Sequence, residues 1–207
     1  MEAATLSAGL SLSWLETSFA HLQGFEALNT EAAVVPAGSE GLFFLPYLAG
    51  GRTPHFDPEA RALFYGLTLR HNRGHMTRAI MEGVAYSYRD CLSIMENLGI
   101  KANRIIASGG GARSPLWLQI QSDVLGHEIR TTGVTEQASF GAALAAGVGV
   151  GLFADIPTAC SRLLPGEGQI IYPDPARSKI YDRGYSIYRD LYRSVSSFGE
   201  RLAGLNL

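Results

Sequence analysis

Lysine is almost absent from this chain of 207 residues, in which Lys101 and Lys179 are the only examples. Neither lysine follows a G-x-x-x-x-G pattern, so a Walker A phosphate-binding loop is excluded. Cysteine is equally scarce, and Cys91 and Cys160 lie far apart, without the spacing of a zinc site. Because the start of the chain shows no signal-peptide pattern, both are expected to be reduced thiols in the core of a cytoplasmic protein.

Charge is also limited, since charged residues make up 17% of the chain, the net charge is -2 and the pI is near 6.2. The arginines are scattered along the sequence, which excludes the basic footprint of a nucleic-acid-binding protein. The longest uncharged run, residues 137–154, is shorter than the roughly 20 apolar residues that span a bilayer. It predicts a buried helix and no membrane anchor, and its GAALAAG segment would let another backbone or a ligand ring lie close.

What the chain does contain is enough apolar sequence, 46% of its residues, to bury one core. Strand-like and helix-like patterns alternate along it, which predicts an α/β domain. Strands are expected over residues 41–48, 62–69, 104–108 and 127–131. Helices are expected over residues 5–19, 71–99, 115–126, 137–149 and 176–198, with another after Asp155. Residues 20–41 and 165–175 are predicted to be loop and turn, and Gly99 to cap the helix before it.

The most informative segment is a strand, RIIAS, followed by the glycine turn GGGARS and the helix PLWLQIQSDVLG, residues 104–126 together. Gly109, Gly110 and Gly111 let the backbone turn sharply and approach a ligand with no Cβ in the way. The following helix directs unpaired N–H groups and the positive end of its dipole toward an anion. A nucleotide phosphate is the ligand that this order favours, although a plain strand-to-helix turn, which needs one glycine, remains open.

A dinucleotide-binding turn is a second interpretation of the same glycines. Gly109 and Gly111 fit the first two glycines of G-x-G-x-x-G, whereas Ser114 stands where the third should be. Glu128 lies near the expected position of the acid that binds the ribose. A dehydrogenase-type cofactor domain that prefers NAD to ATP therefore stays open at this point.

The acidic residues near these motifs have structural explanations. Asp57 is expected to cap the turn before Pro58 rather than act as a general base. Asp123, inside the helix after the glycine turn, is expected to make a structural hydrogen bond. Glu82 is interpreted as a partner of Arg78 on the helix surface, because the two are four residues apart.

Histidines occur in two segments where a site is conceivable from the sequence. His71 and His75 are four residues apart at the start of a helix, but no third ligand pattern accompanies them, so no metal site is predicted. His55 lies in GGRTPHFDP, residues 50–58, whose two prolines exclude regular structure and indicate a surface or cleft loop. His55 is therefore a weak candidate for contact with a substrate.

Three long stretches resemble the C-terminal domain of FGGY-family carbohydrate kinases, nearest to the xylulokinase branch. They are GLFFLPYLAGGRTPHFDPEARALFYGLTLRHNRGHMTRAIMEGVAYSYRD (residues 41–90), SGGGARSPLWLQIQSDVLG (108–126) and FGAALAAGVGVGLF (140–153). The resemblance implies an actin-like, ribonuclease-H-like ATPase fold, the C-terminal lobe of a two-lobe sugar kinase lacking its first strands. It implies one domain over residues 1–207, with 176–207 as a C-terminal helical segment.

The resemblance also assigns a nucleotide site for ATP, with Mg²⁺ carried on the nucleotide. The glycine turn would carry the phosphates and the first helix would flank the adenosine. The implied contacts are Gly9, Ser13, Gly109, Gly110, Gly111 and Ser114. Related kinases can place a longer amide side chain at position 13, which makes Ser13 the least certain of these contacts.

In such kinases the catalytic aspartate belongs to an N-terminal lobe, which this chain is expected to lack. We therefore expect no turnover from the chain alone, an N-terminal lobe as partner, and self-association through an uncovered sheet edge. The implied reaction is phosphoryl transfer from ATP, leaving ADP, to a sugar, with a pentulose such as xylulose favoured. Gly51 replaces the glutamate expected before RTP, which leaves the sugar open. A noncatalytic actin-like module that binds nucleotide or a protein partner is the alternative.

Overall fold

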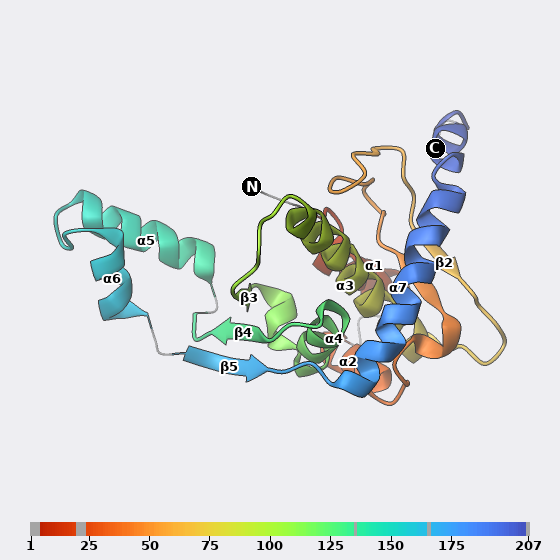
Figure 1. The fold of residues 1–207 in the computed structure, drawn as a ribbon, viewed down its shortest axis with the longest axis horizontal. Helices are drawn as coiled ribbons and strands as arrows, with labels where there is room; N and C mark the ends of the chain where they lie inside the picture. Colours follow the sequence, from red (N-terminus) through yellow and green to blue (C-terminus); the bar gives the residue numbers. More distant parts are fainter. Residues whose placement is uncertain (1–4, 20–23, 135, 165–166, 206–207) are drawn as a thin grey trace.

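The computed structural model describes residues 5–19, 24–134, 136–164 and 167–205. Figure 1 shows a helical body on one side, a small sheet beside it, and a helical hairpin that projects from the far end of the sheet. Residues 20–23 of the predicted loop, 165–166 of the predicted turn and 206–207 of the C-terminal segment lie outside the described residues.

The helices and strands form a mixed α/β domain that is rich in helix. In chain order they are α1 Ala8–Phe19, α2 Gly24–Ala33, the 3-10 turn η1 Ser39–Gly41, β1 Phe43–Leu45, β2 Leu63–Tyr65, α3 Arg73–Asn97, β3 Ile105–Ala107, the 3-10 turn η2 Gly110–Arg113, α4 Pro115–Leu125, β4 Ile129–Thr132, α5 Gln137–Gly149, α6 Ile156–Leu163, β5 Glu167–Ile171, α7 Pro175–Val195 and α8 Phe198–Ala203. The strands β1 and β2 form an antiparallel pair, while β3, β4 and β5 form a second sheet in that order. Because β3 and β4 are parallel and α4 connects them, the glycine turn lies inside a βαβ unit.

Helix α3 is the central element of the core. It begins at a capping box in which the Asn72 side chain accepts from the backbone N–H of His75, and it ends before Gly99, whose φ is +81°. The predicted helix and its glycine cap are therefore confirmed. Strand β1 lies directly on α3, because a Cβ at Gly83 would overlap the carbonyl oxygen of Phe44.

Two elements were missed in the sequence. Helix α2 lies where residues 20–41 were predicted to be a loop, and Leu28 and Ala32 are its only buried residues, too few to produce a clear apolar period. Strand β5 lies where residues 165–175 were predicted to be a turn. It becomes a strand by antiparallel pairing with β4, with Ile171 opposite Ile129, a partner that is distant in the sequence.

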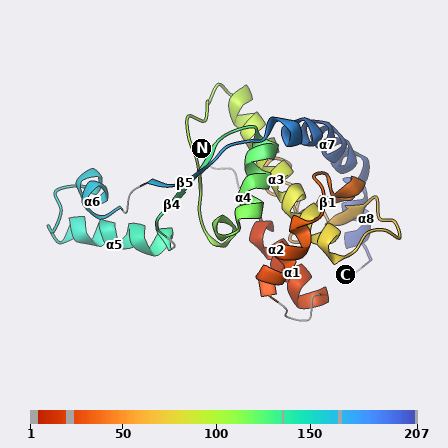
Figure 2. The same ribbon diagram turned by 90° about the horizontal axis from the view of Figure 1, so that it is seen from below.

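The prediction of a buried helix over residues 137–154 is wrong. Helix α5 is present, but Leu144 and Gly147 are its only buried residues, and Val150 and Leu152 after it are largely exposed. Figures 1 and 2 show α5 and α6 projecting together from the body. Helix α5 therefore packs against α6 and lies away from the helical body. Within the part of the chain that the structure describes, no helix has both the length and the apolar character to cross a membrane.

Helix α7 packs on α3 through the buried residues Tyr181, Tyr185 and Tyr188. Beneath it, Arg78 Nε donates to Glu82 Oε1 at 2.9 Å, as their spacing predicted. The expected surface position is wrong, however, because the Glu82 side chain is 3% exposed. Burial raises the pKa of the Glu82 carboxyl, and the adjacent Arg78 guanidinium opposes that rise.

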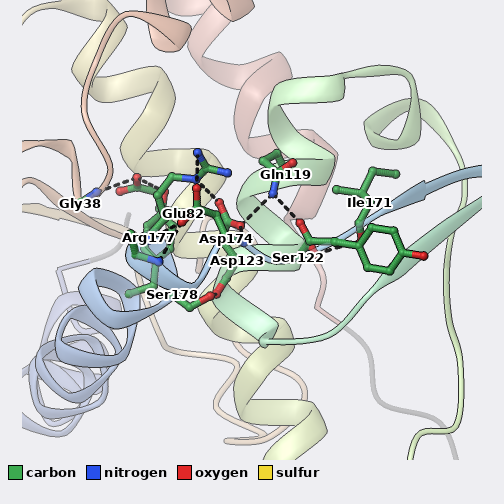
Figure 3. A network of polar contacts seen from close by, with 12 residues as sticks. Gly38, Glu82, Gln119, Ser122, Asp123, Ile171, Asp174, Arg177 and Ser178 are labelled. Atoms are coloured by element: carbon green, nitrogen blue, oxygen red, sulfur yellow. Dashed lines mark hydrogen bonds and ion pairs between the residues drawn. The ribbon is translucent and has the colours of Figure 1, made fainter.

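Hydrogen bonds to Asp123 connect α4 to the start of α7, as Figure 3 shows. Its buried carboxylate accepts from Arg177 Nε at 2.5 Å, from the backbone N–H of Asp174 at 2.7 Å and from Gln119 Nε2 at 2.8 Å. The hydrogen bond from Arg177 raises the pKa of that guanidinium. The predicted structural role of Asp123 is confirmed, and α4 is thereby held firmly behind the glycine turn.

Candidate nucleotide site

A cleft of about 1040 Å³ opens between α1, α2, α3, strand β3 and the glycine turn. It brings together positions that are about 100 residues apart in the sequence. Five of the six predicted nucleotide contacts line it, namely Gly9, Ser13, Gly110, Gly111 and Ser114. The sixth, Gly109, directly precedes Gly110 in the same turn. The structure thus places the first helix and the glycine turn on one cavity.

The glycine turn has the geometry of an open backbone cradle. Gly109 has a φ of 76°, which a residue with a side chain rarely adopts. Its carbonyl accepts from the N–H of Ala112 at 3.1 Å, which begins the 3-10 turn η2. The N–H groups of Gly110 and Gly111 precede that first bond and have no partner within the turn. A Cβ built on Gly110 would meet no heavy atom within 4 Å, so this backbone faces open space.

Ser114 fixes the end of the turn to the body. Its buried Oγ accepts from the backbone N–H of Trp117 at 3.1 Å, capping α4, and donates to Asn29 Oδ1 at 2.8 Å. Trp117 Nε1 in turn donates to the carbonyl of Met81 on α3 at 3.1 Å. Asn29 was missed as a site residue because its helix, α2, was predicted to be a loop.

On the α1 side, the residues at the edge of the cleft are small and leave it unobstructed. Gly9 is exposed, and a Cβ there would meet no atom within 4 Å, while Ser13 Oγ donates to the Gly9 carbonyl at 3.3 Å. The deeper walls are apolar, with Leu12, Leu28, Met81 and other side chains from three helices. A small polar rim over apolar walls is the usual character of a site for a ligand with a flat ring.

One charged side chain lines the cleft among the described residues, and it belongs to Arg113 in η2. Its Nη2 lies 3.3 Å from Glu136 Oε1, at the N-cap position of α5, in an exposed ion pair. No aspartate or glutamate is part of the described lining. The described lining therefore offers no carboxylate ligand to a divalent cation.

His55 lies outside the cleft lining. Its ring stacks on Tyr192 of α7 at 3.6 Å, and its Nε2 lies 4.0 Å from Asp90 Oδ2. Burial lowers the pKa of His55. Asp57 accepts from the N–H of Glu59 at 3.0 Å, which confirms the predicted turn cap, and from the hydroxyl of Tyr192 at 3.0 Å. The loop of His55 is thus packed against α7.

The rings of His71 and His75 lie 5.2 Å apart at the start of α3. Across the residues that the structure describes, no group of three or more histidine, cysteine, aspartate and glutamate side chains could hold a metal ion. The pair is used in turns instead, since His71 Nδ1 accepts from the backbone N–H of Thr68 at 2.9 Å.

The strand register weighs against a dinucleotide site. Ile105 pairs with Ile129 and Ala107 with Thr131 in parallel, so the glycine turn follows the carboxyl end of β3. Glu128 precedes β4 and therefore lies at the opposite end of the sheet, where it forms an ion pair with Arg130 at 2.9 Å. The expected ribose-binding acid is not beside the turn.

Comparison with known proteins agrees with these motifs. Residues 1–150 match the family described as the FGGY family of carbohydrate kinases, C-terminal domain. The chain belongs to this family. The xylulose kinase of Staphylococcus epidermidis is 37% identical to the FGGY domain over 191 residues, which cover 92% of this chain and 38% of that protein.

Solved structures support the fold of this FGGY domain. The crystal structure of xylulose kinase from Rhodospirillum rubrum has a TM-score of 0.80 and 35% identity, covering 96% of this chain and 39% of that one. Plasmodium falciparum glycerol kinase, crystallised with ADP, matches with a TM-score of 0.72 at 23% identity, over 88% of this chain and 36% of its own, and shows the fold alone. The xylulokinase-like resemblance and the actin-like ATPase fold are confirmed. The chain spans 38% to 40% of the length of curated relatives such as those from S. epidermidis and Lactococcus lactis.

Proposed function

We propose that this FGGY domain is the ATP-binding lobe of a xylulokinase-like sugar kinase in the cytoplasm. The glycine turn binds the phosphates of ATP, and the helix with Gly9 and Ser13 flanks the adenosine. In a complete enzyme the γ-phosphate passes to a hydroxyl of a pentulose such as xylulose. One observation carries the proposal: the turn and the helix, about 100 residues apart in the sequence, line a single cleft.

The properties of the cleft suit MgATP. Its volume of about 1040 Å³ is that of a site for a ligand of nucleotide size. The open N–H groups of Gly110 and Gly111 offer hydrogen bonds to phosphate oxygens, and Mg²⁺ bound to the phosphates neutralises further charge. Phosphoryl transfer depends mainly on such positioning and charge neutralisation.

The catalytic base is proposed to come from an N-terminal lobe. A general base must lie within hydrogen-bonding distance of the attacking sugar hydroxyl, and no carboxylate is part of the described cleft lining. Asp123, which is nearby on α4, is engaged with Arg177 and Asp174. The chain by itself is therefore predicted to bind nucleotide without turning over sugar.

Calorimetric titration and an ADP-release assay test this proposal. We expect the chain to bind MgATP more tightly than NAD, and to release no ADP with xylulose or glycerol until a kinase N-terminal lobe is added. The stronger binding of MgATP follows from the position of Glu128, which is away from the turn. Tighter binding of NAD, or turnover by the chain alone, would contradict the proposal. Nucleotide binding with no turnover after the lobe is added would favour the noncatalytic module.

A kinase N-terminal lobe is also the proposed cover for strand β3. Among the described strands, β3 pairs with β4 alone, and Ile105, Ile106 and Ala107 contribute to the cleft wall. Ile106 is 48% exposed, so its strand combines an unpaired edge with apolar surface.

We expect the chain without that lobe to self-associate at micromolar concentration, measured by light scattering. Ile106→Lys should shift it toward monomer, because a lysine on an edge strand opposes strand pairing. Leu69→Lys, a change at an exposed residue outside the cleft lining, is the matched control. A monomer in the unsubstituted chain would refute the expectation.

A further inference from the structure

Arg113 has a position that the glycine turn alone does not explain. It ends η2, directly before Ser114, and is the one charged side chain among the described residues that line the cleft. Its present partner is Glu136, at 3.3 Å between Nη2 and Oε1. The side chains of Arg113 and Glu136 are 66% and 78% exposed. Because both side chains are exposed, the Arg113 guanidinium can leave the Glu136 carboxylate without leaving a buried charge unpaired.

We infer that Arg113 binds the phosphates of the nucleotide and that Glu136 competes with them for it. This inference rests on the proposed ATP site. It assigns to Arg113 the dependence of binding on the phosphate charge of the nucleotide. An exposed ion pair with one contact contributes little to stability, because solvent screens both charges. A guanidinium offers a planar set of donors that matches phosphate oxygens, and its hydrogen bonds to them are charge-assisted. A bound polyphosphate is thus the stronger partner.

The position of Arg113 within the turn supports this exchange. The backbone N–H groups of Gly110 and Gly111 lie three and two residues before it in the same 3-10 turn. Phosphates held by those groups would lie beside the base of the Arg113 side chain. Glu136 precedes α5, so the exchange would also release the contact between the turn and the α5–α6 hairpin.

The test compares ligands that differ in phosphate charge. MgATP, MgADP and adenosine are titrated into the unsubstituted chain, Arg113→Gln and Glu136→Gln. We expect Arg113→Gln to weaken MgATP binding about tenfold, the loss of charge-assisted hydrogen bonds, and to leave adenosine within about twofold. Glu136→Gln should tighten MgATP binding about twofold, because the competing carboxylate is gone. Arg162→Gln, an exposed arginine of α6 outside the cleft lining, is the matched control and should change neither.

The outcomes separate this inference from the proposed function. MgATP binding that Arg113→Gln leaves unchanged would overturn the role of Arg113 while the ATP site stands. An equal loss for MgATP and adenosine would also overturn it, because a structural defect acts on both ligands. If the unsubstituted chain bound neither ligand, the proposed function would fail and the inference with it. The thermal unfolding midpoint of each variant is measured as well, to check that the fold is retained.

Discussion

Gly110→Val is expected to weaken MgATP binding at least about 100-fold, or about 2.8 kcal/mol, while the chain stays folded. A Cβ at this position meets no protein atom within 4 Å, so the valine side chain enters the cleft that Gly110 lines without strain in the body. It then occupies the space through which phosphate oxygens reach the N–H groups of Gly110 and Gly111. The substitution removes phosphate access and leaves Gly9, Ser13 and the apolar walls intact.

Calorimetry with MgATP and adenosine, together with thermal unfolding, measures the effect. Gly149→Val is the matched control, since a Cβ there also meets nothing within 4 Å and the residue ends α5, outside the cleft lining. The control should bind MgATP as the unsubstituted chain does. Undiminished binding by Gly110→Val would mean that the three glycines form only a turn.

Glu82→Gln is expected to lower the free energy of unfolding by about 3 kcal/mol, the cost of breaking a buried ion pair. The carboxylate accepts hydrogen bonds from Arg78, from the Tyr181 hydroxyl at 2.9 Å, from Ser39 Oγ at 2.8 Å and from the N–H of Gly38 at 3.0 Å. An amide cannot accept all of these, and it leaves the buried Arg78 guanidinium without a counter-ion. The substitution would destabilise the region where α7 and η1 meet α3. Figure 3 shows the hydrogen bond between Gly38 and Glu82 in this region.

Urea unfolding followed by circular dichroism measures this change. Glu59→Gln is the control, because Glu59 pairs with Arg61 at the surface, with side chains 38% and 40% exposed, and its loss should cost less than about 1 kcal/mol. Adding Arg78→Met to Glu82→Gln should recover part of the stability, since no unpaired charge remains. Equal losses for Glu82→Gln and Glu59→Gln would show that the pair is not buried in solution.

Much of the local structure was predictable because its causes are local. The capping box at Asn72 and Gly99 mark the two ends of α3 within a few residues of the helix itself. The glycine turn depends on the conformational freedom of Gly109 and on Ser114, which caps α4 through the N–H of Trp117 three residues later. Such signals act within one turn of chain, so they can be recognised without knowledge of the fold.

The errors share a different cause, which is distance along the chain. Strand β5 exists because Ile171 pairs with Ile129, which lies in β4 on the other side of α5 and α6 in the sequence. Glu82 is buried because Ser39 and Tyr181 close over it. None of these partners lies near enough in the sequence to leave a periodic signal at the residue concerned.

The sequence by itself determined the order of helices and strands around the glycine turn, the motifs that place the chain in the FGGY family, and the residues proposed to bind nucleotide. The tertiary structure decided that Gly9, Ser13 and the turn share one cleft, that Asn29 holds Ser114 across 85 residues of sequence, and that Arg113 supplies its charge. The reason is physical: a turn or a cap is stabilised by its own neighbours. A cleft is made by side chains that meet only when their helices pack, so its walls have no signature in any one segment.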